Sequence, residues 1–308
     1  MRIVFFGTPA FAAEILRFLL ENHVDVAAVV TQPDRPKGRS LHLTPSPVKV
    51  VAAGASLPIL QPEKASQEPF LSEIAAFQAD LFVVVAFGQI LSQKLLDTPK
   101  LGCINVHASL LPKYRGAAPI QRVLMAGDSE TGIAIQKMVR QLDAGDVIAV
   151  SKVPVPQDMT FGELEEKLIA ATKPLLLEVI REYQKRIPAG EPQIHDQATY
   201  ASKIELEEGE VLWSKPAQEI HNLIRAFSPR PGAWCWIHAN GEKKRLKILR
   251  SQYVSGKGQP GQILSQDGIV ACGDGALKLI EVQPEGKKAM KAADWLRGFK
   301  GSFYTQTT

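Results

Sequence analysis

The sequence predicts a two-domain α/β protein, in which a doubly wound, mostly parallel sheet precedes a smaller β-barrel. Over the first half of the chain, short apolar runs alternate with segments of helical spacing. About five short strand-like runs, several of them separated by glycine, fill the last hundred residues. The length of 308 residues is enough for two domains of ordinary size.

The elements of the first domain follow in chain order. Residues 2–6 form an apolar strand, and Pro9 suits the first turn of a helix that extends to about residue 22. The β-branched run at 24–31 is typical of a buried parallel strand. Residues 32–39 hold two prolines, a glycine and three basic residues, which predicts a loop. Buried strands at 81–86 and 102–107, with helices between them, predict right-handed βαβ units.

The second half of the chain changes from helix to short strands. Thr160 and Glu163 form a capping box that opens a long helix, and Pro174 inside this helix is expected to kink or break it. We expect the first domain to cover 1–189, a polar, proline- and glycine-containing linker 190–208, and the second domain 209–308. Within the second domain we expect a helix at 217–226 and strands at 233–238, 246–253, 262–264, 269–271 and 277–282.

Composition excludes several classes of protein. A hydrophobic content of 45% with 22% charged residues is too apolar for extensive disorder. No uncharged stretch is longer than 81–93, which is shorter than the roughly 18 residues of a membrane span, and the apolar run at 3–6 is shorter than a signal-peptide core of roughly 7–15. The three cysteines are scattered without a CxxC pair, which favours a reducing, cytoplasmic setting without disulfides or structural zinc.

Charge is distributed unevenly between the two predicted domains. Residues 1–208 hold 21 Lys and Arg against 24 Asp and Glu, a net charge of −3. Residues 209–308 hold 15 against 8, a net charge of +7. A small basic domain indicates a polyanionic partner such as a nucleic acid. A solvated basic surface explains the same charge equally well, so charge alone does not decide between them.

Three polar residues form the candidate catalytic group. Asn105 and His107 lie two residues apart at the end of the 102–107 strand, so their side chains point to the same side. Asp143 lies in the turn after the strand at 133–138, from which it can approach His107 and fix its tautomer. Such a group suits acyl transfer to an amine: Asn105 stabilises the oxyanion, and His107 handles the proton. Each residue alone has an ordinary structural explanation, as a satisfied strand end or a turn.

Other chemistries are disfavoured. The incoming amine makes an enzyme nucleophile unnecessary, and Ser109 lacks the G-x-S-x-G elbow, so it is expected only to position backbone. The first domain has neither G-x-G-x-x-G nor G-x-x-x-x-G-K-[S/T], which argues against a dinucleotide or a nucleoside triphosphate. The remaining histidines lack ligand spacing, so no metal is expected.

The chain resembles the formyltransferase family that uses 10-formyltetrahydrofolate. The resemblance is carried by Asn105-x-His107, Ser109-Leu110-Leu111-Pro112, Arg115-Gly116 and Leu142-Asp143-x-Gly145-Asp146. Segments at 32–39, 45–49, 224–234, 273–277 and 283–290 are similar to the branch of this family that acts on methionyl-tRNA. The similarity covers nearly the whole chain in order, which is more specific than any single motif.

The resemblance implies a Rossmann-like first domain, an OB-like second domain and formyl transfer to the α-amine of methionyl initiator tRNA in translation initiation. It implies that Asn105, His107 and Asp143 are catalytic, and that the protein binds folate and tRNA as a monomer without metal or membrane. The implied folate-binding residues are Phe87, Gly88, Gln89, Ile90, Leu91, Ser109, Leu110, Leu111 and Pro112. The implied tRNA-binding residues are Arg35 and Arg39 in the inserted loop and Lys287 and Lys288 in the basic domain.

Two further functions stay open at this point. The first is a formyltransferase for a small amine, such as an amino sugar nucleotide or glycinamide ribonucleotide, although a small substrate does not need a basic barrel. The second is a non-catalytic RNA-binding protein with a relic domain, against which the complete set of Asn105, His107 and Asp143 argues.

Overall fold

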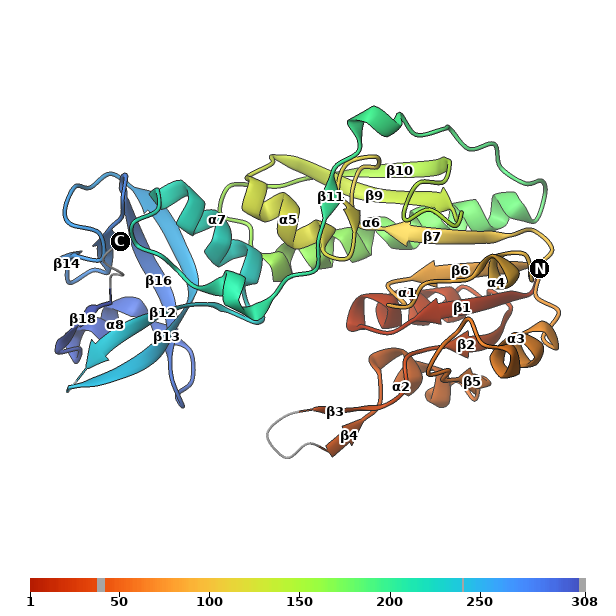
Figure 1. Cartoon of the computed structure of the whole chain (residues 1–308), viewed down its shortest axis with the longest axis horizontal. Helices are drawn as coiled ribbons and strands as arrows, with labels where there is room; N and C mark the ends of the chain where they lie inside the picture. Colours follow the sequence, from red (N-terminus) through yellow and green to blue (C-terminus); the bar gives the residue numbers. More distant parts are fainter. Residues whose placement is uncertain (38–41, 240, 305–308) are drawn as a thin grey trace. The chain divides into compact units, whose positions relative to one another are not determined.

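The apolar run near the N-terminus forms an interior strand of a seven-stranded sheet (Figure 1). The sheet order is β10 (Val147–Pro154), β9 (Glu130–Lys137), β7 (Cys103–His107), β6 (Leu81–Val85), β1 (Ile3–Gly7), β2 (Val26–Val30) and β5 (Ile59–Leu60). Pairing is parallel from β7 to β5, and β9 runs antiparallel to β7. The predicted mostly parallel sheet is therefore confirmed.

The computed structural model describes residues 1–37, 42–239 and 241–304. Its packing divides the chain into two units that interleave along the sequence. The first unit comprises Met1–Ala117, Thr131–Val153 and Glu166–Ala201, and the second comprises Ala118–Glu130, Pro154–Glu165 and Ser202–Thr308. The domain boundaries at 189 and 209 stay a prediction, because these units are not continuous stretches of chain. No helix in the described ranges combines the length and apolar character of a membrane span.

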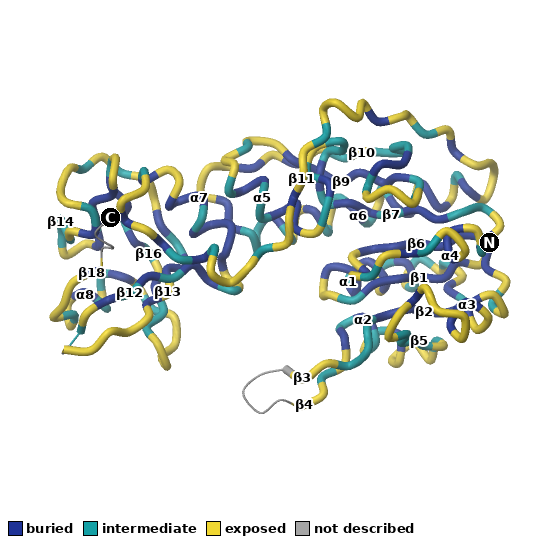
Figure 2. Tube along the Cα trace, viewed as in Figure 1, coloured by how far each residue is buried: buried dark blue, intermediate teal, exposed yellow. Residues whose placement is uncertain are grey.

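Apolar helix faces cover the central strands of the first unit. Residues 3–6 of β1 are fully buried, and Phe6 contacts Phe82 and Phe87 with ring centroids 5.0 and 5.4 Å apart. Figure 2 shows these strands as the buried centre of the unit. The helices are α1 (Ala10–Glu21), α2 (Pro47–Gly54), α3 (Glu68–Ala75), α4 (Gln93–Leu96) and the long α6 (Phe161–Tyr183).

Two local expectations can be compared with the structure. Helix α6 continues through Pro174 without a break, and a kink there stays a prediction: the proline removes one of many backbone hydrogen bonds, while Leu168, Leu176 and Val179 stay buried along the helix. The loop expected at 32–39 instead begins an antiparallel pair, β3 (Arg35–Lys37) with β4 (His42–Thr44). The capping box of Thr160 with Glu163 is confirmed by reciprocal hydrogen bonds.

The second unit is built around a nearly closed antiparallel barrel, as predicted. The sheet order is β14 (Ile263–Ser265), β15 (Ile269–Ala271), β16 (Ala276–Pro284), β13 (Glu242–Val254), β12 (Ala233–Ala239) and β18 (Gly301–Phe303), with β17 (Met290–Lys291) paired to β16. The unit's helices are α5 (Pro119–Ala126), α7 (Ala217–Phe227) and α8 (Ala292–Arg297). Helix α7 packs against both α5 and β13, and thus buries its apolar face.

Candidate active site

Strand β7 positions the first two candidate catalytic residues. Asn105 and His107 alternate with the buried Ile104 and Val106, so they share one face of the sheet. The neighbouring β9 places Gln136 directly opposite Asn105. Gln136 is buried, which brings a third polar side chain to this face. Sequence reasoning did not identify Gln136, because nothing in its local pattern marks a polar residue inside an apolar strand as functional.

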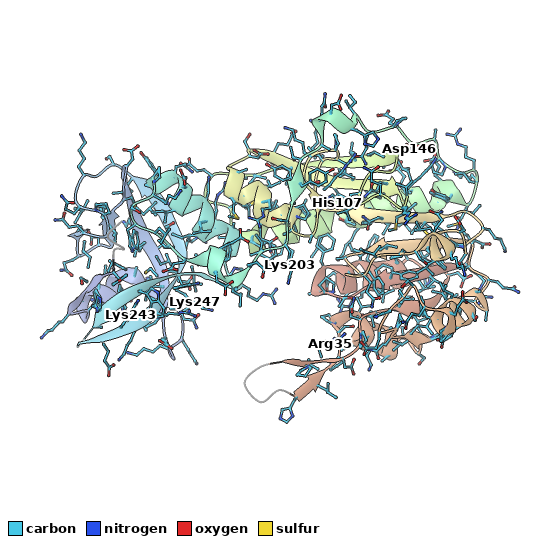
Figure 3. All side chains as sticks on the ribbon, viewed as in Figure 1. Arg35, His107, Asp146, Lys203, Lys243 and Lys247 are labelled. Carbon is cyan, nitrogen blue, oxygen red and sulfur yellow. The ribbon has the colours of Figure 1, made fainter. Side chains whose placement is uncertain are left out.

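Asp143 joins them from the turn after β9. Its backbone lies in the left-handed region at φ 47°. The backbone N–H of Lys137 donates to the Asp146 carbonyl at 2.9 Å, which closes the turn. Figure 3 labels Asp146 and His107 on the ribbon. Gly145 has no room for a side chain, because a Cβ there would collide with the Lys137 carbonyl. The backbone hydrogen bond and the close packing at Gly145 therefore fix the conformation of the turn, so that Asp143 lies next to the strand.

Three N–H groups hold the Asp143 carboxylate. Oδ1 accepts from Gln136 Nε2 at 2.9 Å and from Asn105 Nδ2 at 3.3 Å, and Oδ2 accepts from the Gly116 backbone N–H at 2.9 Å. Oδ2 also lies 3.6 Å from His107 Nδ1. The three predicted residues therefore converge: Asn105 and Asp143 share a hydrogen bond, and the His107 ring lies beside the same carboxylate. This carboxylate is suited to orienting its neighbours, because its own position is fixed from several sides.

The hydrogen-bond partner of His107 Nε2 shows which ring nitrogen carries the proton in the neutral side chain. Nε2 lies 2.8 Å from the Tyr114 carbonyl, which can only accept a hydrogen bond, so Nε2 carries a proton. In the neutral ring, Nδ1 then holds a lone pair on the side of Asp143. Nδ1 therefore faces the Asp143 carboxylate, 3.6 Å from its Oδ2. His107 is buried, which favours this direct interaction over hydration.

Gln193 and Arg115 support the Asp143 turn from behind. Gln193 Nε2 lies 2.9 Å from the Asp143 carbonyl, 2.7 Å from the Gly145 carbonyl and 3.3 Å from Gln136 Oε1. Its Oε1 accepts two hydrogen bonds from Arg115, at 2.7 and 3.1 Å, and Arg115 is only 1% exposed. Gln193 falls in the segment expected to be a linker, where sequence reasoning gave no signal of a site residue.

The implied folate-binding residues lie on the loops after β6 and β7. Phe87, Leu91 and Ser109 are buried, and Ser109 donates to the Lys113 carbonyl at 2.6 Å. Gln89 accepts from the Ala65 N–H and donates to the Pro62 carbonyl. Gly88 and Ile90 are exposed, and Leu110, Leu111 and Pro112 are half-buried. Because β6 and β7 are adjacent and parallel, their two loops leave the same edge of the sheet.

The implied tRNA-binding residues are exposed where they are described. Arg35 forms an ion pair with Glu63 at 3.1 Å, both side chains being well exposed. Lys287 and Lys288 lie in the turn between β16 and β17. Arg39 lies outside the described residues.

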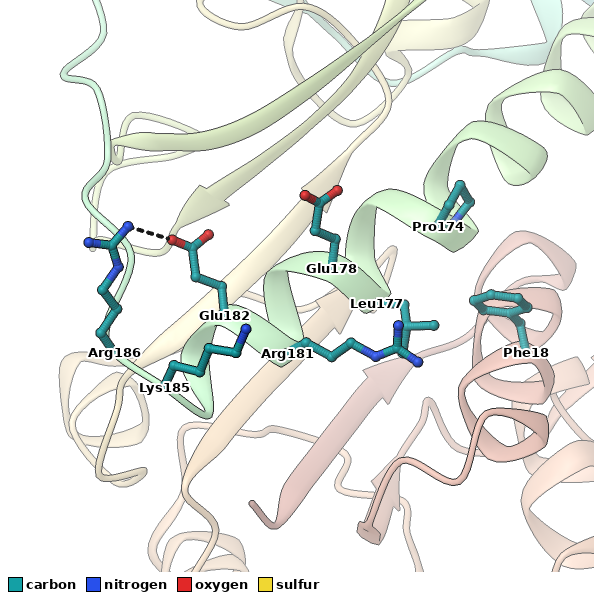
Figure 4. A pocket seen from close by; sticks show the side chains of 8 residues that line it. All are labelled: Phe18, Pro174, Leu177, Glu178, Arg181, Glu182, Lys185 and Arg186. Carbon is teal, nitrogen blue, oxygen red and sulfur yellow. Dashed lines mark hydrogen bonds and ion pairs between the residues drawn. The ribbon is translucent and has the colours of Figure 1, made fainter.

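A pocket elsewhere in the first unit contains none of the predicted site residues. It has a volume of about 730 Å³ and lies between α1 and α6 (Figure 4). Its lining includes Phe18, Pro174, Leu177 and Arg181. In the described part of the chain, His, Cys, Asp and Glu side chains form no group of three that could ligate a metal ion. Burial raises the pKa of the Cys103 thiol to about 12, which disfavours it as a nucleophile.

Comparison with known proteins identifies the family of this chain. Residues 1–180 match the formyl transferase family model, and residues 203–300 match the model of the formyl transferase C-terminal domain. The methionyl-tRNA formyltransferase of Protochlamydia amoebophila is 50% identical over 97% of this chain and 95% of its own length. The chain belongs to the methionyl-tRNA formyltransferase family. A second member of this formyltransferase family, from Brucella anthropi, is 45% identical over 97% of this chain and 98% of its own length.

A solved structure supports the same fold. WlaRD, a sugar 3N-formyl transferase determined in the presence of dTDP and 5-N-formyl-THF, superposes with a TM-score of 0.66. The superposition covers 94% of this chain and 99% of that protein at 18% sequence identity. At 18% identity the similarity establishes the formyltransferase fold of this chain. It does not identify the amine that accepts the formyl group.

Proposed function

We propose that this protein transfers the formyl group of 10-formyltetrahydrofolate to the α-amino group of methionyl initiator tRNA. The observation that carries the proposal is the convergence of Asn105, His107 and Asp143, with a hydrogen bond from Asn105 to Asp143 and the His107 Nδ1 atom 3.6 Å from the Asp143 carboxylate. Near-full-length relatives at 45–50% identity, all named methionyl-tRNA formyltransferase, support the choice of acceptor. The net charge of +7 over residues 209–308 supports it further, because tRNA is a polyanion.

Asn105 stabilises the negative charge of the reaction. When the amine attacks the formyl carbon, the carbonyl oxygen becomes an oxyanion that requires N–H donors. Asn105 uses one amide hydrogen on Asp143 Oδ1 at 3.3 Å, and a second hydrogen remains on the same nitrogen. Asp143 therefore orients the Asn105 amide as well as the imidazole.

His107 moves the proton. The attacking amine must lose a proton, and the departing nitrogen of the donor must gain one. Nδ1 of the Nε2-protonated ring accepts the first proton, and the imidazolium that forms lies 3.6 Å from Asp143 Oδ2. The same nitrogen then gives the proton to the leaving group, so the enzyme returns to its starting state. No covalent intermediate on the protein is required.

The surroundings of the cluster fit a folate donor. Ile90 is 85% exposed on the loop after β6, and Leu142 is 59% exposed immediately before Asp143. Large exposed apolar side chains on site loops are a suitable surface for a flat ring system. The backbone of residues 87–91 and 109–112 adds N–H and C=O groups beside them, in the region where ligands of open α/β sheets bind.

Formyl transfer to different acceptors tests this function. The protein is incubated with 10-formyltetrahydrofolate and methionyl initiator tRNA, beside free methionine, glycinamide ribonucleotide and an amino sugar nucleotide. Activity that requires the charged tRNA is the expected result. Activity with a small amine alone would retain the Asn105, His107 and Asp143 mechanism and overturn the acceptor. Tight tRNA binding with no transfer to any amine would favour a binding protein.

A further inference from the structure

Strand β12 presents two different faces. Ala233, Cys235 and Ile237 are buried, whereas Trp234, Trp236 and His238 alternate with them on the outer face. Two tryptophans on the outer face of a sheet retain apolar surface in water, because both remain partly exposed. Their rings contact each other edge-on, with centroids 5.5 Å apart.

The adjacent strand β13 places a cation opposite each of these residues. The register pairs Trp234 with Lys247, Trp236 with Arg245, and His238 with Lys243. All three cations are exposed, while the alternating Leu246 and Ile248 are buried. Figure 3 labels Lys243 and Lys247, which project from this strand. The outer face of the β12–β13 pair, together with Tyr304, is called the aromatic–basic stripe below.

Cations and rings alternate within the aromatic–basic stripe. The Arg245 guanidinium lies 4.2 Å from the Trp234 ring centroid and 4.9 Å from that of Trp236. The Lys243 ammonium lies 4.5 Å from Trp236 and 4.3 Å from Tyr304. The rings thus hold two flexible cationic side chains in place before any ligand arrives.

The charges of the aromatic–basic stripe are not neutralised by its neighbours. Among the described residues, neither Lys243 nor Arg245 forms an ion pair with a carboxylate. Glu285 is the adjacent acid, and its Oε2 accepts from the backbone N–H of Arg245 at 3.3 Å. A solvated face of a soluble domain mixes both signs of charge, whereas this face combines cations with aromatic rings.

We infer that the aromatic–basic stripe is a stacking surface for unpaired nucleotides of the RNA acceptor. This inference rests on the proposed function for the identity of the RNA. Arg245 presents a planar guanidinium on which a base can stack, while Lys243 and Lys247 meet the phosphates. Bases inside a duplex keep their faces covered by their neighbours, so this chemistry selects unpaired nucleotides. The stripe is distinct from Lys287 and Lys288, which lack aromatic partners in the described structure.

Substitutions that separate stacking from charge test this inference in the full chain. Arg245→Lys keeps the charge and removes the planar group, Trp236→Leu removes a ring, and Trp236→Phe retains one. Lys257→Gln, at an exposed cation near the far end of β13, is the control for loss of one charge. Each variant is assayed for the KM of methionyl-tRNA, the KM of the folate donor and the thermal midpoint.

We expect Trp236→Leu and Arg245→Lys to raise the KM for tRNA about tenfold, with the folate KM and the thermal midpoint unchanged. Trp236→Phe should restore most of the affinity. An unchanged tRNA KM in both Trp236→Leu and Arg245→Lys, with formyl transfer intact, would overturn the stripe and leave the proposed function standing. An equal rise in the KM for tRNA in Lys257→Gln would also overturn the stripe, because the loss of one positive charge would then explain the loss of tRNA affinity.

A binding measurement distinguishes failure of the stripe from failure of the proposed function. Tryptophan fluorescence is followed during titration with a uridine octanucleotide and with an RNA duplex of equal length, without any turnover. Quenching by the single strand that exceeds quenching by the duplex, and that is lost in Trp236→Leu, supports the stripe whichever amine is formylated. Equal quenching by both RNAs, or none by either, overturns it.

Discussion

The Gln193→Glu substitution removes the side-chain N–H group that holds the Asp143 turn. It keeps the side-chain oxygen that accepts hydrogen bonds from Arg115. Glutamate can still accept from Arg115, so the buried guanidinium keeps a partner. The carbonyls of Asp143 and Gly145, now bonded at 2.9 and 2.7 Å, lose their donor and face a carboxylate oxygen. Each unmet buried acceptor costs about 1–3 kcal/mol, which amounts to about 2–6 kcal/mol for the pair. The turn then shifts and carries the Asp143 carboxylate with it.

A displacement of about 1 Å at a catalytic group lowers turnover by roughly a hundredfold. For Gln193→Glu we therefore expect a kcat about 10²-fold lower, a KM for tRNA close to that of the wild type, and a reduced thermal midpoint. Gln197→Glu, an exposed change in the same segment, is the matched control. Formyl transfer is assayed with both substrates saturating, well below the midpoint of each variant. A kcat within twofold of the wild type would refute the role assigned to Gln193.

Asp143→Ala removes the group that orients both Asn105 and His107, so turnover should fall at least about 10²-fold while tRNA binding hardly changes; a binding loss as large as the turnover loss would contradict the catalytic role. Changing Lys287 and Lys288 together to alanine should weaken tRNA binding and reduce its salt dependence by about one unit of slope per lost phosphate contact; an unchanged slope would remove them from the interface. Hydrogen bonds from Arg122, at 2.6 and 3.0 Å, lower the pKa of Glu208, so their contribution to stability is present above the ordinary value of about 4.5 and lost as the pH falls through the lowered pKa. In chemical denaturation, Arg122→Gln should therefore be less stable than the wild type near neutrality and approach it in acid; a deficit independent of pH would rule out this linkage.

The periodicity of apolar residues predicted the architecture, because the alternation of buried and exposed positions is a local property of the chain. The apolar run at 3–6 becomes a fully buried strand, and the short runs after 230 become the strands of the barrel. The same reasoning paired Asn105 with His107, since residues two apart on a strand share a face. Of the kink or break expected at Pro174, the break does not occur, because burial of the neighbouring helix residues offsets one missing hydrogen bond. The prediction of a loop at 32–39 failed at 35–37, where a short strand pairs with residues 42–44.

Only the tertiary structure shows which side chains hold the candidate site in place. Gln136 comes opposite Asn105 because β9 pairs antiparallel with β7, and no pattern within β9 specifies that register. Gln193 lies 50 residues beyond the turn that it holds, in a segment with few large apolar residues. Buried polar side chains take partners wherever packing brings an unmet donor or acceptor, irrespective of their distance along the chain. The sequence by itself therefore determined the fold and predicted the candidate catalytic residues, and tertiary packing decided which distant side chains hold those residues in place.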